Sequence, residues 1–351
     1  MTHTSLPAVR SRTRGSWDRS VAEAAVEIAR RAPSIHNTQP WRWHVDADGL
    51  TLLADPRRQL AVADPDGHSL LISCGAALRL TELGLQSGGW QVDTHRMPDP
   101  ARPEVLARFS RPRPVEVTEA VRQQASAALR RHSDRRPFQP RPVPADLLDG
   151  LRGATDRNGV HVHFPARPQE RTNLAVAVSW ADRIERHDDA YVAELARWLR
   201  PAELGTGVVS ADGVVLGAVP MVGDGPPRHT DVPLRDFELG VSGRELIARD
   251  VDEQPSIAVL LTDSDSPLDQ LLAGEAMMAL MLAAEQAGLS SCPLSQAVDL
   301  IAFRSRLHTL MGWQGCPQMM LRIGYPATGA APQRTPRRLV TDVLSGGWPG
   351  R

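Results

Sequence analysis

Two long, nearly apolar segments constrain the fold of this 351-residue chain more than any other feature of its sequence. Residues 69–89 and 275–288 both have helical character, and each ends in a turn of small residues. A helix that is apolar on most of its faces must be buried on most of its faces. We therefore expect the two segments to lie in the core, at the centre of the molecule.

The two apolar segments also match each other in sequence. At a constant spacing of 200 positions, residues of the first helix recur in the second: Ala76, Leu80 and Gly88 correspond to Ala276, Leu280 and Gly288. Such coincidences are common in alanine-rich helices. The match therefore indicates two related halves only in combination with the motifs described below.

The remaining pattern predicts several helices, one hairpin and two buried strands. Residues 18–31 have helical spacing, and residues 41–54 alternate around a turn at Asp46–Gly49. Residues 97–117 are polar and rich in proline, which predicts a connection without regular structure. The other expected elements are a helix, turn and helix over 121–154, one charged helix or a helix pair over 171–199, and strands over 255–263 and 317–326.

Residues 201–235 have no period and contain six glycines and five prolines. A loop of this length is uncommon in a compact domain unless it has a function. We expect a lid here.

Charge and composition exclude some functions. The formal net charge is -1, so the surface as a whole has no field that would attract nucleic acid or an anionic membrane. The chain has no lysine, and all 40 basic residues are arginine. Any phosphate site must therefore use guanidinium groups, which bind phosphate in a bidentate manner.

Three cysteines far apart in the chain favour neither a disulfide framework nor a closed zinc site. No stretch reaches the roughly 18 apolar residues of a membrane span, and residues 1–17 lack the apolar core of a signal peptide. We therefore expect a cytoplasmic protein with a short disordered leader at 1–17, and neither a membrane nor a nucleic acid as partner.

Several motifs, taken together, resemble those of the FMN-dependent nitroreductase superfamily. They are RRAPSIHNTQPWRW at 30–43, RRHSDRRPF at 130–138, EQAGLSSCPLSQ at 285–296, IGYP at 323–326 and RTPRR at 334–338. In the superfamily the arginine cluster normally precedes the PSxxNxQPW segment, whereas here it follows by about 100 residues. This order, and the length of the chain, make it most similar to the Acg-type FMN-binding family of actinobacteria.

The resemblance implies an α+β, nitroreductase-like fold in which two pseudo-equivalent halves form an intramolecular pseudo-dimer with a lid. The halves would span 18–117 and 118–351, with the lid at about 201–235 and a sheet of four or five strands in each half. Only one complete set of motifs is present, so one FMN per chain is expected. The fused chain would be a monomer, or a homodimer of fused chains.

The resemblance also implies which residues bind the flavin. Those expected at the phosphate are Arg131, Ser133 and Arg135 from one turn, with Arg334, Arg337 and Arg338 as candidates to close the other side. His132 is expected to flank the flavin. Those expected at the ring are Pro33, Ser34, Ile35 and Asn37 from the first half. The segment Pro293, Leu294, Ser295 and Gln296 would present a backbone N–H to flavin N5.

Each motif also has a simpler interpretation when it is considered alone. RRHSDRR could be a solvated charge run at a helix end. SIHNTQPW could be a loop held by asparagine hydrogen bonds. The CPLSQ segment could be a loop that ends a helix. His36 and His132 would be structural, since hydride transfer through a flavin needs no dedicated base, and no catalytic side chain or metal ligand is assigned.

The implied function is a nitroreductase-like oxidoreductase. Hydride from NAD(P)H would pass to flavin N5 and then to an electron-poor small-molecule acceptor, whose identity the sequence does not give. An alternative is an FMN-sequestering or storage protein, in which the lid closes off the flavin and little turnover occurs. A third hypothesis, chemistry on the flavin itself, has no residue that singles it out.

Overall fold

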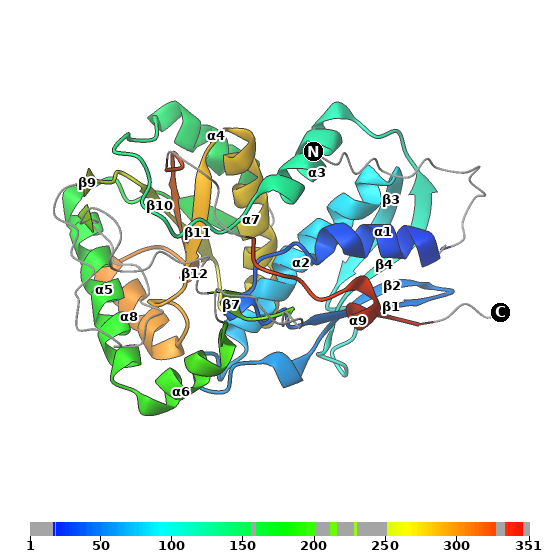
Figure 1. The fold of residues 1–351 in the computed structure, drawn as a ribbon, viewed down its shortest axis with the longest axis horizontal. Coiled ribbons are helices and arrows are strands. Elements are labelled where there is room, and N and C mark those ends of the chain that lie inside the picture. Colours follow the sequence, from blue (N-terminus) through cyan, green and yellow to red (C-terminus); the bar gives the residue numbers. More distant parts are fainter. Residues whose placement is uncertain are drawn as a thin grey trace.

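The computed structural model describes residues 17, 19–155, 159–200, 211–215, 228–229, 251–327 and 334–346. Two antiparallel-rich sheets lie on opposite sides of a central pair of helices, α2 and α7 (Figure 1). Helices α2 (His68–Ser87) and α7 (Pro267–Gln286) are buried along most of their length. The structure therefore confirms that the two apolar segments form the core of an α+β fold.

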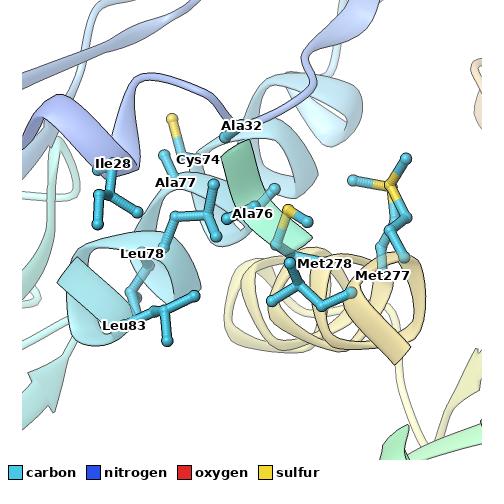
Figure 2. Packing of buried hydrophobic residues seen from close by; sticks show 14 of the residues in the cluster. Ile28, Ala32, Cys74, Ala76, Ala77, Leu78, Leu83, Met277 and Met278 are labelled. Atoms are coloured by element: carbon cyan, nitrogen blue, oxygen red, sulfur yellow. The ribbon is translucent and has the colours of Figure 1, made fainter. Parts of the chain in front are cut away.

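The central helices touch through glycine. A Cβ atom on Gly75 would lie 2.0 Å from the Leu271 carbonyl oxygen, and one on Gly274 would lie 2.1 Å from that of Ile72. Around this crossing, apolar side chains of both helices pack together and against α1 (Arg19–Ala29), as Figure 2 shows for Ile28, Leu78 and Met278. Only glycine permits so close a backbone approach.

Helix α7 begins eight residues before the predicted start at 275. Ser266 caps its first turn by accepting a hydrogen bond from the Asp269 N–H at 3.3 Å, and the Asp269 carboxylate accepts one from the Ser266 N–H at 3.1 Å. Pro267 occupies the first helical position. This is the capping-box arrangement, which fixes where a helix starts.

The first sheet has the strand order β13-β1-β2-β4-β3. Strands β1 (Trp41–Asp46) and β2 (Gly49–Ala54) form the predicted hairpin. The prediction of a connection over 97–117 is wrong for its central part, where β4 (Val105–Pro114) pairs with β3 (Trp90–Arg96) and with β2. The prolines of this range lie before β4 or in its second half, whereas Leu106 and Phe109 are buried in the core.

The second sheet has the order β11-β12-β10-β5 and is antiparallel throughout. Its strands are β5 (Val160–His163), β10 (Ser256–Thr262), β11 (Ser290–Leu294) and β12 (Cys316–Gly324). The sheets thus have five and four strands, within the expected range.

The other elements surround this core. The charged region over 171–199 forms a pair of helices, and helices are present in both places expected within 121–154. The remaining helices are α3 (Glu119–Arg130), α4 (Ala145–Thr155), α5 (Pro168–Arg186), α6 (Asp189–Trp198), α8 (Ile301–Met311) and α9 (Val340–Val343), with short 3-10 turns η1 (Ile35–Asn37) and η2 (Pro56–Arg58). Two-residue strands form the pairs β6 (Leu199–Arg200) with β7 (Val214–Val215) and β8 (Arg228–His229) with β9 (Val251–Asp252).

The carboxyl-terminal arm crosses to the first sheet, where β13 (Leu344–Ser345) pairs in parallel with β1. The predicted range 118–351 for a second half therefore includes residues that pair in the first sheet. Trp17, included in the predicted leader, is 3% exposed and packs in the core. The rest of the leader, and the predicted lid apart from 211–215 and 228–229, lie outside the described residues.

Among the described residues, no helix combines the length and the apolarity that crossing a membrane requires.

Candidate functional site

One pocket lies where the 33–37 segment, the end of α3 and the carboxyl-terminal arm meet. Its volume is about 710 Å³, part of which is open to solvent. Most of the predicted site residues line it: Pro33, Ser34, Asn37, Arg131, His132, Ser133, Arg135, Arg334 and Arg337. A concave site in which several polar side chains converge beside apolar ones is typical of small-molecule binding sites.

The loop over 33–39 is held in an unusual conformation. His36, Asn37 and Gln39 have φ values of 42°, 55° and 51°, which is the left-handed region that residues other than glycine rarely adopt. Ser34 Oγ accepts a hydrogen bond from the Gln39 N–H at 2.9 Å. Ser73 Oγ, on α2, accepts one from the Ile35 N–H at 3.2 Å. These bonds to the two serines hold the loop in this strained conformation.

Asn37 and Gln39 join the loop to two distant segments. Asn37 Nδ2 donates to the carbonyl oxygens of Gly213 at 3.0 Å and Pro336 at 3.1 Å. Gln39 Nε2 donates to Ala211 O at 2.7 Å, and its Oε1 accepts from the Arg338 N–H at 2.9 Å. The loop therefore binds the 211–215 segment and the carboxyl-terminal arm at one edge of the pocket.

Asn37 also carries an unused acceptor. Its Oδ1 atom is buried and has no hydrogen-bond partner among the described residues. The orientation of the amide is set by the two carbonyl oxygens that Nδ2 contacts. Buried acceptors are nearly always satisfied, so a ligand with an N–H donor fits here.

Two arginines that line the pocket have no carboxylate partner among the described residues, the buried Arg131 and the half-buried Arg337. Arg131 is 7% exposed, and its NH1 group donates to the Arg31 carbonyl oxygen at 2.8 Å. Arg337 NH1 donates only to oxygens of Thr335 and Pro336. The Nε atoms of both are buried without a hydrogen-bond partner among these residues.

The electrostatics of this pair favour an anion. Burial lowers the pKa of Arg131 to about 10; the negative charge of Glu285 opposes this shift, and the positive charge of Arg334 adds to it. Burial, together with the charges of Arg131 and Arg31, lowers the pKa of Arg337 to about 9. Cations that depress one another's pKa in this way are stabilised when a ligand brings negative charge between them.

Asp134 holds the arginine-rich turn in shape. Its carboxylate accepts hydrogen bonds from Arg136 Nε at 2.9 Å and NH2 at 2.8 Å. Although burial alone would raise it, the hydrogen bonds and the positive charge of Arg136 keep the pKa of Asp134 below its usual value. The Asp134 N–H also donates to Ser291 O at 3.0 Å, so the turn is attached to the start of β11.

Six predicted residues are not in the lining, including Arg338, whose backbone N–H donates to Gln39. Ile35 instead packs against an apolar cluster around Leu60 and Leu195. The others lie in or directly after β11: Pro293, Leu294, Ser295 and Gln296. The buried Gln296 donates to Asp182 at 3.3 Å, and Ser295 Oγ donates to Asp299 at 3.0 Å. Their contact with a cofactor remains a prediction.

The sequence interpretation missed several lining residues. Arg31 could have been found, since it lies inside the quoted RRAPSIHNTQPWRW motif, and Thr335 lies inside the quoted RTPRR motif. Ala128, Leu129 and Val214 add an apolar wall and carry no motif. No group of three or more His, Cys, Asp or Glu side chains within the described ranges could hold a metal ion.

The chain thus folds as two sheets around one helix pair. Its basic pocket is lined by residues from the amino-terminal part of the sequence, such as Asn37, and from the carboxyl-terminal part, such as Arg337. Protein Rv3131 of Mycobacterium tuberculosis, provisionally named an NAD(P)H nitroreductase, is 33% identical over 336 residues, which cover 95% of this chain and 92% of Rv3131. The M. tuberculosis protein Acg, with the same provisional name, is 31% identical over 334 residues, covering 92% of this chain and 95% of Acg.

A solved nitroreductase with bound FMN from Bacteroides fragilis is 15% identical, with a TM-score of 0.36, and the match covers 59% of this chain and 90% of that one. No family model matches the chain. From the two full-length relatives, the chain belongs to the nitroreductase superfamily and, within it, to the family of Acg.

Proposed function

We propose that this chain is an FMN-dependent oxidoreductase that uses NAD(P)H as reductant and binds one FMN per chain. The observation that carries the proposal is a pair of arginines in the same pocket, the buried Arg131 and the half-buried Arg337. Neither has a carboxylate partner among the described residues, and the Nε atom of each is buried. The names of the full-length relatives support NAD(P)H as the electron source.

The donors in the pocket fit a phosphate ester. A phosphate dianion accepts bidentate hydrogen bonds from guanidinium groups and further bonds from hydroxyl or backbone donors. Arg131, Ser133 and Arg337 provide such donors together, and Arg334 lies at the exposed side. Their charges would be neutralised by the ligand, which removes the cost of burying them.

The other side of the pocket fits the flavin ring. Pro33 offers an apolar surface, and the buried Asn37 Oδ1 offers an acceptor to a ring N–H. Bound flavin supplies the redox chemistry, taking a hydride from the nicotinamide and passing electrons to an electron-poor small molecule. The protein residues bind and orient, so neither His36 nor His132 is given a proton-transfer role.

The remaining parts of the proposal are a cytoplasmic location and a monomer or a homodimer of fused chains. Location rests on three free cysteines, as expected for a reducing compartment. The lid at about 201–235 and the backbone contact from 293–296 to flavin N5 also belong to the proposal.

A second function, FMN sequestration or storage, is favoured by one observation. The 211–215 segment is fixed to the loop beside the pocket by the bonds to Asn37 and Gln39, and Val214 lines the pocket itself. A segment held there restricts the approach of a second planar ligand. Turnover would then require this segment to move.

Flavin stoichiometry tests the proposal. Purified chain, reconstituted with FMN and desalted, should retain one flavin, and the double variant Arg131→Ala, Arg337→Ala should bind FMN at least about tenfold more weakly. An exposed arginine in an ion pair, Arg122, provides the control variant Arg122→Ala. Wild-type chain that retains no flavin, or a double variant that binds like wild type, would contradict the proposal.

A further inference from the structure

The pocket has more positive charge than one phosphate requires. Its described lining includes five arginines and a histidine but no carboxylate: Arg31, Arg131, Arg135, Arg334, Arg337 and His132. A phosphate dianion balances about two positive charges. With Arg131 and Arg337 matched to that group, the other arginines still produce a positive field in the pocket.

Arg31 is one of the other arginines, and its only carboxylate partner among the described residues is shared with a second arginine. Its backbone carbonyl anchors Arg131, while its side chain, 33% exposed, lines the pocket. Arg31 NH2 lies 3.2 Å from Glu27 Oε1, but Arg30 NH2 contacts the same oxygen at 2.5 Å. One exposed carboxylate shared by two guanidiniums leaves a net positive charge, and Arg31 Nε is buried without a hydrogen-bond partner in the described part of the chain.

Arg334 gives the mouth a second underused guanidinium. It is exposed, and the hydrogen bond found for its side chain is a 3.3 Å contact with the Arg130 carbonyl oxygen. Ala128 and Leu129 of α3 and Val214 line the same pocket and add apolar surface to it. An apolar wall beside free guanidinium donors suits a planar aromatic molecule that carries an anionic group.

We infer that the mouth of this pocket is a second anion subsite. Arg31, assisted by Arg334, binds the anionic group of the ligand that enters beside the flavin, and so favours a planar aromatic ligand that carries such a group. The inference rests on the proposed function and deepens it, since it names the class of the second ligand. That anion belongs either to the nucleotide reductant, as the 2′-phosphate of NADPH, or to an acidic acceptor.

The test compares two matched pairs of redox-inert probes on flavin-loaded chain by titration calorimetry. Naphthalene-2-sulfonate is paired with neutral 2-naphthalenemethanol, and NADP+ is paired with NAD+. Wild-type chain should prefer the anionic member of at least one pair by about tenfold, and Arg31→Gln should abolish most of that preference. If Arg31→Gln loses the preference within the sulfonate pair, the subsite binds an acidic acceptor. If it loses the preference within the nucleotide pair, the subsite binds the reductant.

Arg19→Gln is the matched control, because Arg19, like Arg31, forms an ion pair with a glutamate of α1 at i,i+4 spacing, in its case Glu23. It removes one positive charge away from the pocket, and both preferences should stay at wild-type strength. Raising NaCl from 50 to 500 mM provides a second readout without mutation, since screening should reduce the preference of wild-type chain.

Equal preferences in wild type and Arg31→Gln, or a wild type without preference in either pair, would overturn the inference. The flavin absorption of each sample separates this outcome from failure of the proposed function. A chain that binds no flavin contradicts the proposed function, while the same titrations on that chain still report whether Arg31 selects anions.

Discussion

The side-chain amide of Asn37 donates a 3.1 Å hydrogen bond to the carbonyl oxygen of Pro336, 299 positions further along the chain. The same nitrogen donates to Gly213 O at 3.0 Å. One side chain thus joins the strained 33–39 loop, the 211–215 segment and the arm that carries Arg337. The geometry of the pocket therefore depends on this amide, in addition to any contact it makes with a ligand.

Asn37→Asp should weaken FMN binding more than Asn37→Gly. The aspartate keeps the shape and tolerates the left-handed backbone, but its carboxylate would face two carbonyl oxygens and would compete with phosphate for Arg337. We expect FMN affinity to fall at least about tenfold for the aspartate and by less for glycine. Equilibrium dialysis with FMN measures both, with the exposed Asn173→Asp on α5 as control. Equal losses in the two Asn37 variants would contradict the electrostatic part of this account.

Replacing Arg337 with methionine should separate binding from stability. The buried guanidinium lacks a carboxylate partner among the described residues, so its removal should leave the flavin-free chain as stable as wild type or more so, while FMN binds at least about tenfold more weakly. Urea unfolding of the flavin-free chain measures the first effect, and flavin titration measures the second.

Arg322→Met is the contrasting variant. Arg322 is fully buried in an ion pair with Glu253, so its removal leaves a buried charge without a partner and should cost about 3–5 kcal/mol. If Arg337→Met destabilised the flavin-free chain as much as Arg322→Met, Arg337 would be structural and not a ligand donor.

The crossing of α2 and α7 should not tolerate a single methyl group. In Gly75→Ala the new Cβ would lie 2.0 Å from a backbone oxygen, so the helices must separate, which we expect to cost about 3 kcal/mol or more. Gly153→Ala, on α4, places a methyl group where nothing lies within 4 Å and should stabilise the chain by up to about 1 kcal/mol. Thermal unfolding distinguishes the two, and similar effects would contradict the close crossing.

Two buried groups at the start of α2 should give opposite pH dependences of stability. Burial, with the charge of Asp299, raises the pKa of Asp64 from 3.8 to about 7, so the folded chain holds a proton that the unfolded chain has lost. This contribution makes stability fall as pH rises from about 4 to 7. Burial lowers the pKa of His68 from 6.5 to about 4, so its contribution makes stability rise from about pH 4 to 6.5.

In wild type these slopes oppose each other, and single variants should reveal them. His68→Gln should become less stable as pH rises from about 4 to 7, whereas Asp64→Asn should become more stable, each by at most about 1.4 kcal/mol per pH unit. Chemical unfolding at several pH values measures the slopes, with the double variant expected to be nearly flat. Slopes of the same sign in both single variants would refute the assignment.

Features that depend on local sequence could be predicted. The hairpin over 41–54 and the buried helix over 69–89 have a clear period, and glycines mark where they end. The pocket could be predicted in part because motifs carry its donors, such as Arg131 and Asn37.

Features that depend on residues far away in the sequence could not be predicted. β13 has two residues and forms only because β1 offers it an edge, some 300 residues earlier in the chain. β4 contains prolines and arginines that resemble a connection, yet its apolar residues complete the first sheet. Val214 lines the pocket because Asn37 bonds to its neighbour Gly213, and no local pattern encodes that contact.

The most direct test of the central claim is an anaerobic titration of the flavin-loaded chain with NADPH and then NADH, followed by flavin absorption near 450 nm, where an oxidised flavin absorbs. The account predicts that the band bleaches with one equivalent of at least one nucleotide and returns when an electron-poor quinone is added. A bound flavin that stays oxidised with both nucleotides would contradict the oxidoreductase function and leave sequestration as the role of the site.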